Sequence, residues 1–149
     1  AGDVAVVPYG RGTHMKGIRM GGNGDVTESH LLWARTDTGC FVPSPAVAHG
    51  KVYVLRDRGE VHCIDPGTGK SHWEDAFPRA SSSFYASPTV AGTKLYAPRE
   101  DGVILIAEVD KGFEYLGAFD MGERVIASPV PIRDRILIRG ERNLLCFGG

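Results

Sequence analysis

Apolar and polar side chains alternate in short runs along the chain, and turn residues separate the runs. In KVYVL (51–55) the two valines alternate with Tyr53 and Leu55, the period of a β-strand, whose successive side chains point to opposite faces of a sheet. His49-Gly50 precedes this run as a two-residue reversal, a length typical of tight hairpins. No window has a convincing 3.6-residue helical period. We therefore expect antiparallel β-structure, and no helix longer than two turns within residues 44–147.

Three similar segments begin with Ser-Pro: SPAVAHGKVYVL (44–55), SPTVAGTKLYAP (87–98) and SPVPIRDRILIR (128–139). The Ser-Pro pairs recur after 43 and then 41 residues. A second series, Trp33, Trp73 and Tyr115, has spacings of 40 and 42 residues. Two series of residues with nearly the same spacing indicate an internal repeat, here of about 42 residues.

Each repeat contains four short segments with strand patterns, separated by turns. In the cleanest repeat these are PAVA, KVYVL, EVHCID and KSHWED. A four-stranded antiparallel meander of about 42 residues is the size of one β-propeller blade. We divide this all-β chain, taken as one domain, into blade parts 1–43, 44–86, 87–127 and 128–149. The first part lacks its innermost strand and the last its outermost strand, so we expect three, four, four and three strands.

The turn CIDPGTGKSHW (63–73) carries the most specific pattern. Its Asp can accept hydrogen bonds from the amides of its own turn, its glycines can take positive φ, and its Trp emerges on the outermost strand. The segment resembles the tryptophan-docking motif of PQQ-type propellers. The resemblance places the small motif residue at Cys63 and matches Asp65, Thr68, Gly69 and Trp73, with Trp33 and Tyr115 as the docking aromatics of the neighbouring units.

The resemblance implies a bacterial, extracytoplasmic protein that is periplasmic or associated with the cell envelope. The family includes quinoprotein dehydrogenases, the non-enzymatic propeller of the outer-membrane assembly machinery and many PQQ-like repeat proteins. Its closed rings have about seven or eight blades, so the chain is expected to form about three and a half blades, the C-terminal half of a larger ring. Open sheet edges and apolar blade faces would drive it to pair with the rest of its propeller or with a second copy.

Two function classes are compatible with these features. The favoured one is a non-catalytic scaffold or binding module without a cofactor. The alternative is a fragment of a PQQ- and calcium-dependent quinoprotein oxidoreductase, whose chemistry needs the quinone over the ring axis, a Ca²⁺ held by carboxylates and amides, and an Asp base. Such enzymes often carry a disulfide between adjacent cysteines. Cys40, Cys63 and Cys146 are isolated, and we expect each to be a small buried hydrophobe.

The best candidate site is the mouth of the ring, where the turns between second and third strands gather with the connections between blades. A mixed-charge surface with exposed aromatics suits the binding of a protein or a glycan, and an ordinary solvated surface is the alternative. The candidate mouth residues are Arg11, His14, Arg56, Asp57, Arg58, Arg79, Phe84, Tyr85, Arg99, Glu100, Asp101, Glu141 and Arg142.

Other features limit the partners. With 17 basic and 18 acidic residues the net charge is −1, which gives no general attraction to nucleic acid or an anionic membrane. No apolar run approaches the length of a membrane span. The five histidines lack the spacing of a zinc site, and no helix follows the glycine-rich segments 10–12 and 21–24 to make a phosphate site. We therefore predict no metal site, no nucleic-acid partner and no membrane span.

Overall fold

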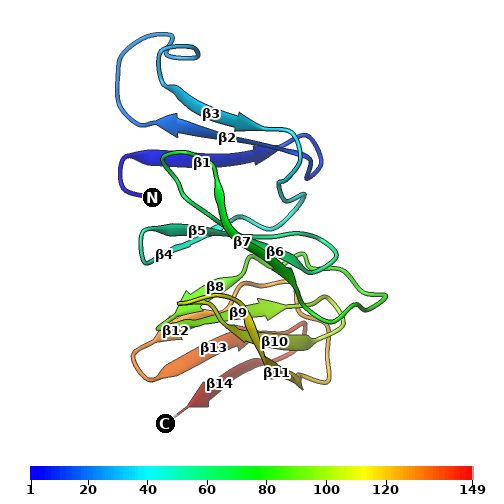
Figure 1. Cartoon of the computed structure of the whole chain (residues 1–149). Helices are drawn as coiled ribbons and strands as arrows, with labels where there is room; N and C mark the ends of the chain where they lie inside the picture. Colours follow the sequence, from blue (N-terminus) through cyan, green and yellow to red (C-terminus); the bar gives the residue numbers. More distant parts are fainter. Residues whose placement is uncertain (149) are drawn as a thin grey trace.

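The computed structural model describes residues 1–148, and its regular structure in this part is antiparallel β throughout. Four separate sheets follow one another in chain order, and the blue N-terminal sheet and the red C-terminal sheet lie at opposite ends of the stack (Figure 1). The sheets contain three, four, four and three strands. The predicted fold class, a partial β-propeller, is confirmed, and no helix interrupts residues 44–147.

Each sheet is a simple meander, here called blades 1 to 4. Blade 1 contains β1 (Val4–Tyr9), β2 (His14–Arg19) and β3 (Leu31–Arg35). Blade 2 contains β4 (Ala46–Ala48), β5 (Lys51–Leu55), β6 (Glu60–Ile64) and β7 (Ser71–Ala76). Blade 3 contains β8 (Thr89–Ala91), β9 (Lys94–Pro98), β10 (Val103–Glu108) and β11 (Glu114–Asp120). Blade 4 contains β12 (Val130–Ile132), β13 (Arg135–Arg139) and β14 (Leu144–Gly148).

The core lies between the blades, because the central strands are buried on both faces. In β5, Val52 and Val54 pack into the core between blades 1 and 2, while Tyr53 and Leu55 pack into the core between blades 2 and 3. All four side chains are fully buried. A third core joins Ile104 and neighbouring residues to blade 4. Each blade thus depends on the next for burial of its apolar face, as in other repeat architectures.

The innermost strands are held in register by the repeated Ser-Pro pairs. The Ser44 amide donates to Ser87 Oγ (2.9 Å), and the Ser87 amide donates to Ser128 Oγ (3.1 Å). The His49-Gly50 reversal has φ of 52° and 69°, the two positive values that a type I′ hairpin requires. The Ser-Pro period therefore has a direct physical cause, a chain of hydrogen bonds from blade to blade.

A β-bulge in every outer strand corrects one predicted equivalence. The bulge lies at Leu32 in β3 and His72 in β7, immediately before Trp33 and Trp73. In β11 it lies at Leu116, so Gly117 rather than Tyr115 occupies the equivalent position. Since the extra residue of a bulge reverses the facing of the residues before it, Tyr115 turns back toward Phe77 of blade 2.

Two burial expectations are also wrong. Tyr115, a predicted docking aromatic and therefore expected to be buried, is 41% exposed and contacts Phe77 of blade 2. Cys40 and Cys63 are buried as expected, but Cys146 is exposed, because β14 is the last strand of its sheet and has a neighbour on one side only. Within residues 1–148 no helix has the length and apolar character needed to cross a membrane.

Candidate functional site

The mouth is the side of the molecule that carries the β1–β2, β5–β6, β9–β10 and β13–β14 turns, on the right in Figure 1. Backbone hydrogen bonds tie the β5–β6, β9–β10 and β13–β14 turns to the connections between blades. The amide of Phe84 donates to Asp57 O (3.1 Å), that of Glu100 to Ser83 O (2.9 Å), and that of Glu141 to Arg124 O (3.0 Å). Side chains on this rim are therefore presented from a fixed backbone.

In the half of the mouth formed by blades 3 and 4, the charges are paired. Arg124 Nε donates to Glu100 Oε1 (2.9 Å), and Arg99 Nε donates to Asp101 (2.9 Å). Arg142 pairs with the buried carboxylate of Glu123 (3.2 Å). Glu123 also accepts hydrogen bonds from the amides of Arg142 and Asn143, at 2.9 and 3.0 Å. The contacts of Glu123 with Arg142 and Asn143 join blade 4 to the preceding connection, and the arginine charges in this half are balanced within the chain.

The half formed by blades 1 and 2 differs, because its arginines are not paired. Arg11, Arg56 and Arg58 line one hollow of about 170 Å³ together with Asp57 and Glu60. None of the three arginines forms an ion pair with another described residue. The guanidinium of Arg11 lies 5.4 Å from the centre of the Phe41 ring, a cation–π geometry. The two sheets therefore bring three unpaired positive charges to one place.

The remaining predicted mouth residues have different environments. Phe84, expected to be an exposed aromatic, is buried: it stacks on Phe77 at 6.1 Å. The connection that carries it folds inward because its backbone bonds to the β5–β6 and β9–β10 turns. Tyr85 is partly buried and Arg79 is exposed. His14 opens β2, where its ring bonds the Thr13 hydroxyl (2.7 Å).

Two charged residues in the half of the mouth formed by blades 3 and 4 were not predicted from the sequence. Glu123 and Arg124 lie in MGERVIA (121–127), the connection between blades 3 and 4. This segment is equivalent to the connection between blades 2 and 3, which the predicted site includes. The equivalence of the two connections could therefore have identified Glu123 and Arg124 as mouth residues.

The DPGTG turn forms the hydrogen bonds that its composition predicts, but of its two glycines only Gly69 has a positive φ, 71°. Asp65 Oδ1 accepts hydrogen bonds from both the amide and the hydroxyl of Thr68, each at 2.8 Å, and these bonds lower the pKa of Asp65. The turn lies under the indole of Trp33, whose Nε1 donates to Pro66 O (2.7 Å). An added Cβ at Gly69 would lie 2.5 Å from that indole, so the close approach requires glycine.

The indole of Trp73 lies in the next interface but lacks the same hydrogen bond. It packs against Tyr53 at 6.1 Å and against Phe113 of blade 3 at 6.0 Å. Its Nε1 is buried and has no hydrogen-bond partner among the described residues. The connection 109–113 in blade 3 therefore supplies an aromatic ring where the DPGTG turn supplies a carbonyl oxygen.

A polar cluster at the outer edge of blades 1 and 2 was not predicted from the sequence. Arg35 donates to Asp37 (2.7 Å), Ser71 (2.8 Å) and the Gly69 carbonyl (3.1 Å). The bond from Arg35 lowers the pKa of Asp37 to about 2. His62 lies beneath, and its burial lowers its pKa. The cluster links the two blades. Among residues 1–148, no three His, Cys, Asp or Glu side chains are grouped as metal ligands would be.

Comparisons with solved structures show the same fold. BamB from Moraxella catarrhalis matches with a TM-score of 0.65 and 15% identity over 90% of this chain and 37% of its own. The quinohemoprotein alcohol dehydrogenase ADHIIG from Pseudomonas putida HK5 matches with a TM-score of 0.68 and 16% identity over 91% of this chain and 26% of its own. The chain thus spans less than two fifths of either protein.

A designed protein is closer in length. The computationally designed Ika4 protein matches with a TM-score of 0.74 and 13% identity, over 98% of this chain and 85% of its own. Among curated proteins, none matches the sequence significantly.

A family comparison covers more than half of the chain. The model of the PQQ_2 family, described as "Outer membrane protein assembly factor BamB", matches residues 24–114. This range contains the DPGTG turn, both tryptophans and two of the three Ser-Pro pairs. On the repeat, the blade topology and this match, the chain belongs to the PQQ_2 family of PQQ-like propellers.

Proposed function

We propose that the chain is part of a non-catalytic propeller that binds an acidic segment of another protein at its mouth. The observation that supports this most is the group of Arg11, Arg56 and Arg58, which have no ion-pair partner among the described residues, whereas Arg99, Arg124 and Arg142 in the other half of the mouth are paired. Arginine forks are well suited to carboxylates. The description of the matching family as an assembly factor is in line with a protein-binding role.

The test uses a fluorescein-labelled oligo-glutamate peptide as the probe and fluorescence anisotropy as the measurement. We expect saturable binding that weakens with added salt, because exposed charges are screened. The double variant Arg11→Glu/Arg58→Glu should weaken binding by at least about tenfold, since like charges then face each other. Arg19→Glu, at the far end of β2, is the matched control and should bind as the unaltered protein does.

Equal losses in the variant and the control would show a general charge effect and overturn the proposed site. The same samples can be mixed with PQQ and Ca²⁺. A quinone spectrum altered by the protein, with dye-linked oxidation of an alcohol, would favour the alternative function, a fragment of a quinoprotein.

In line with the family description, we place the protein outside the cytoplasm, at the cell envelope.

We also propose that the half ring is completed by the rest of its propeller or by a second copy. Val7, Tyr9 and Leu144 on the terminal blades are 42%, 42% and 62% exposed. Covering such surface is favourable by about 25 cal/mol per Å². Light scattering at micromolar concentration should therefore give a mass above 16.1 kDa for this chain alone. A stable monomer with a cooperative melt would contradict association.

A further inference from the structure

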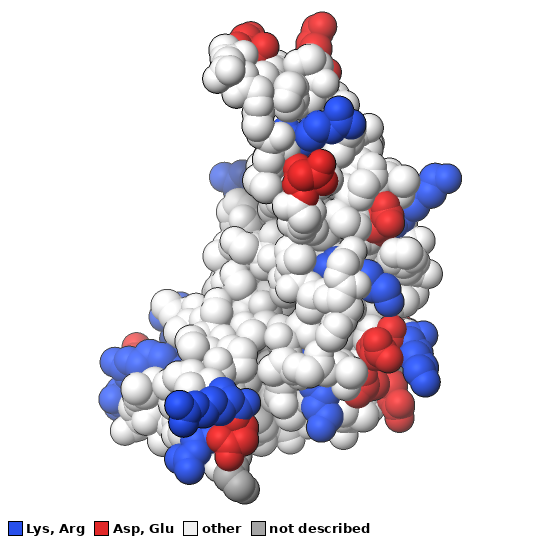
Figure 2. All heavy atoms as spheres, turned by 90° about the vertical axis from the view of Figure 1, so that its left-hand side faces the viewer, with Lys and Arg blue, Asp and Glu red and all other residues white. Residues whose placement is uncertain are grey.

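The connection between β2 and β3 is longer than its counterparts in the next two blades. It covers residues 20–30, whereas the β6–β7 connection covers 65–70 and the β10–β11 connection covers 109–113. It stands away from the blades at the top of Figure 1, and acidic side chains lie at the same end of the molecule in Figure 2. Exposed loop tips are the parts of a folded chain most open to attack from solution.

Hydrogen bonds hold the start of this connection but not its tip, residues 21–24. The amide of Met20 donates to Asp3 O (2.7 Å). In the described part of the chain, no backbone–backbone hydrogen bond involves the tip. A Cβ built on Gly24 would meet no atom within 4 Å. The backbone of the tip can therefore rotate without breaking a hydrogen bond of the fold.

The tip contains the dipeptide Asn23-Gly24. The side chain of an asparagine can be attacked by the amide nitrogen of the residue that follows it. Glycine obstructs this attack least, because it has no Cβ and its backbone is the least restricted. Both residues are exposed to solvent. The structure thus combines a reactive pair with an amide that is free to react.

We propose that Asn23 is a site of spontaneous covalent modification, at which the side-chain amide is lost and a carboxylate is gained. The Gly24 amide gives its proton to hydroxide, and its nitrogen bonds to Cγ of Asn23. The bond from Cγ to the side-chain nitrogen then breaks and ammonia leaves, which closes a succinimide ring. Water opens this ring at one of its two carbonyl carbons. Opening at Cγ gives aspartate, and opening at the backbone carbonyl gives isoaspartate.

The modification changes the charge and the backbone of the connection. It adds a negative charge next to Asp25 and Glu28, and isoaspartate also inserts a methylene group into the main chain. The connection lies at the end of β2 opposite to the β1–β2 turn of the mouth. The inference is therefore independent of the function proposed for the mouth.

The dipeptide Asp101-Gly102 can form the same ring, but the fold holds it. The Gly102 amide donates to Arg99 O (2.9 Å), and the Asp101 carboxylate accepts hydrogen bonds from Arg99 Nε at 2.9 and 3.0 Å. Gly102 is also buried. Because the attack would break these contacts, we expect Asp101 to remain unchanged in the folded protein.

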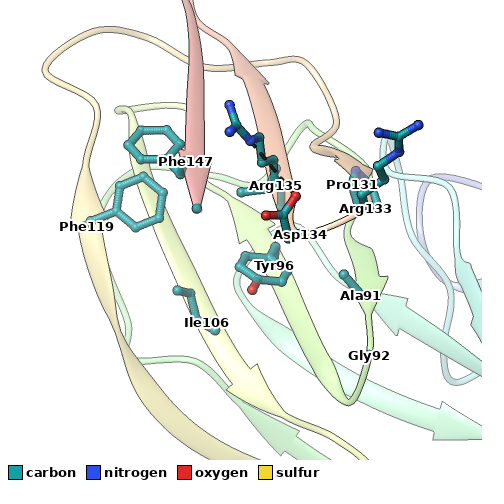
Figure 3. A pocket seen from close by; sticks show the side chains of 12 residues that line it. Ala91, Gly92, Tyr96, Ile106, Phe119, Pro131, Arg133, Asp134, Arg135 and Phe147 are labelled. Atoms are coloured by element: carbon teal, nitrogen blue, oxygen red, sulfur yellow. Dashed lines mark ion pairs between the residues drawn. The ribbon is translucent and has the colours of Figure 1, made fainter.

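The sequence has one other asparagine, Asn143, and it lies in a fixed backbone. Its carbonyl accepts a hydrogen bond from the Gly140 amide (2.8 Å). The next residue is Leu144, whose Cβ obstructs the attack and which opens β14. This strand is packed against blade 3, since Phe147 lies beside Phe119 (Figure 3), with the ring centres 4.8 Å apart. We therefore expect Asn143 to keep its amide.

The test follows the folded protein in mildly alkaline buffer over days by peptide mapping and mass spectrometry. The peptide that carries Asn23 should gain about 1 Da and separate into two products of equal mass, while the Asn143 peptide stays unchanged. The protein unfolded in guanidinium chloride is the reference. The folded rate at Asn23 should lie within about tenfold of the unfolded rate, whereas isoaspartate at Asp101 should form only in the unfolded protein.

Two glycine variants of the same connection sharpen the test. Gly24→Ala should slow the conversion of Asn23 by at least about tenfold, because a Cβ obstructs the attacking nitrogen and restricts its backbone. Gly21→Ala is the matched control: Gly21 also has a positive φ and open space around it, so the rate should stay within about twofold of the unaltered protein. A folded rate more than about tenfold below the unfolded one, equal conversion at Asn143, or equal rates in the two variants would overturn the proposal.

Discussion

The interface between blades 1 and 2 and the interface between blades 2 and 3 hold indoles at equivalent positions in different settings. The indole of Trp33 lies on the DPGTG turn, next to Gly69, and donates to Pro66 O. Trp73 lies against Phe113, and its Nε1 has no partner in the described chain. At the third interface the equivalent residue of blade 3 is a glycine, Gly117. The bulge and the strand register recur, while the group that fills the interface changes from blade to blade.

The comparison separates two contributions to the joining of blades. One is burial of a large ring, which both tryptophans provide. The other is a hydrogen bond across the interface, which only Trp33 makes. A typical hydrogen bond stabilises a fold by about 0.5–1.5 kcal/mol, whereas loss of a buried aromatic ring costs several times more. Burial should therefore dominate at both positions, and the hydrogen bond should appear as a smaller difference between them.

The largest expected effect is at Trp73. Trp73→Ala should lower the free energy of unfolding by about 3–5 kcal/mol, because it removes a large ring that packs against Tyr53 and Phe113 across the interface. Urea melts measure this loss. Tyr115→Ala is the control: Tyr115 is 41% exposed, and its loss should cost less than about 1.5 kcal/mol.

A loss below about 1 kcal/mol at Trp73 would show that its ring contributes little to joining the blades. Similar losses at Trp73 and Tyr115 would contradict the assignment of Gly117, rather than Tyr115, as the third member of the series. Addition of indole to Trp73→Ala should recover part of the stability, since a ligand that binds only the folded state stabilises it.

A smaller effect is expected at Gly69. It has a φ of +71°, and an added Cβ would meet the Trp33 ring, so Gly69→Ala should cost about 1–3 kcal/mol. Gly67, in the same turn, has only the Asp65 carboxylate near its Cβ position, at 3.5 Å. Gly67→Ala should therefore change the stability by less than about 1 kcal/mol. Equal costs in thermal melts would show that the turn, not its contact with Trp33, is the sensitive feature.

Much of the fold could be predicted because its causes are local or periodic. The His49-Gly50 reversal needs two positive φ values, and the Ser-Pro pairs make the same bond in successive blades. Tyr115 was misassigned because a bulge changes which face a residue occupies, and nothing in EYLG (114–117) marks the bulge.

The candidate site was less predictable. The sequence places arginines at every mouth turn but does not show which are paired, because pairing depends on contacts between blades such as Arg124 with Glu100. Phe84 was misjudged for the same reason, since its burial depends on contacts outside its own segment, the backbone bond to Asp57 and the stacking on Phe77.

The smallest effect isolates the hydrogen bond of Trp33. Trp33→Phe and Trp73→Phe each keep a ring in the interface and remove the indole N–H. At Trp33 the change takes the donor away from Pro66 O, whereas at Trp73 it removes a buried donor that has no partner in the described chain. Trp33→Phe should therefore be the more destabilising by about 1 kcal/mol. Urea melts with equal m-values would make the difference a true difference in stability. Equal losses would mean that the bond to Pro66 adds nothing to ring burial, and a larger loss at Trp73 would mean that its N–H is bonded to water in solution.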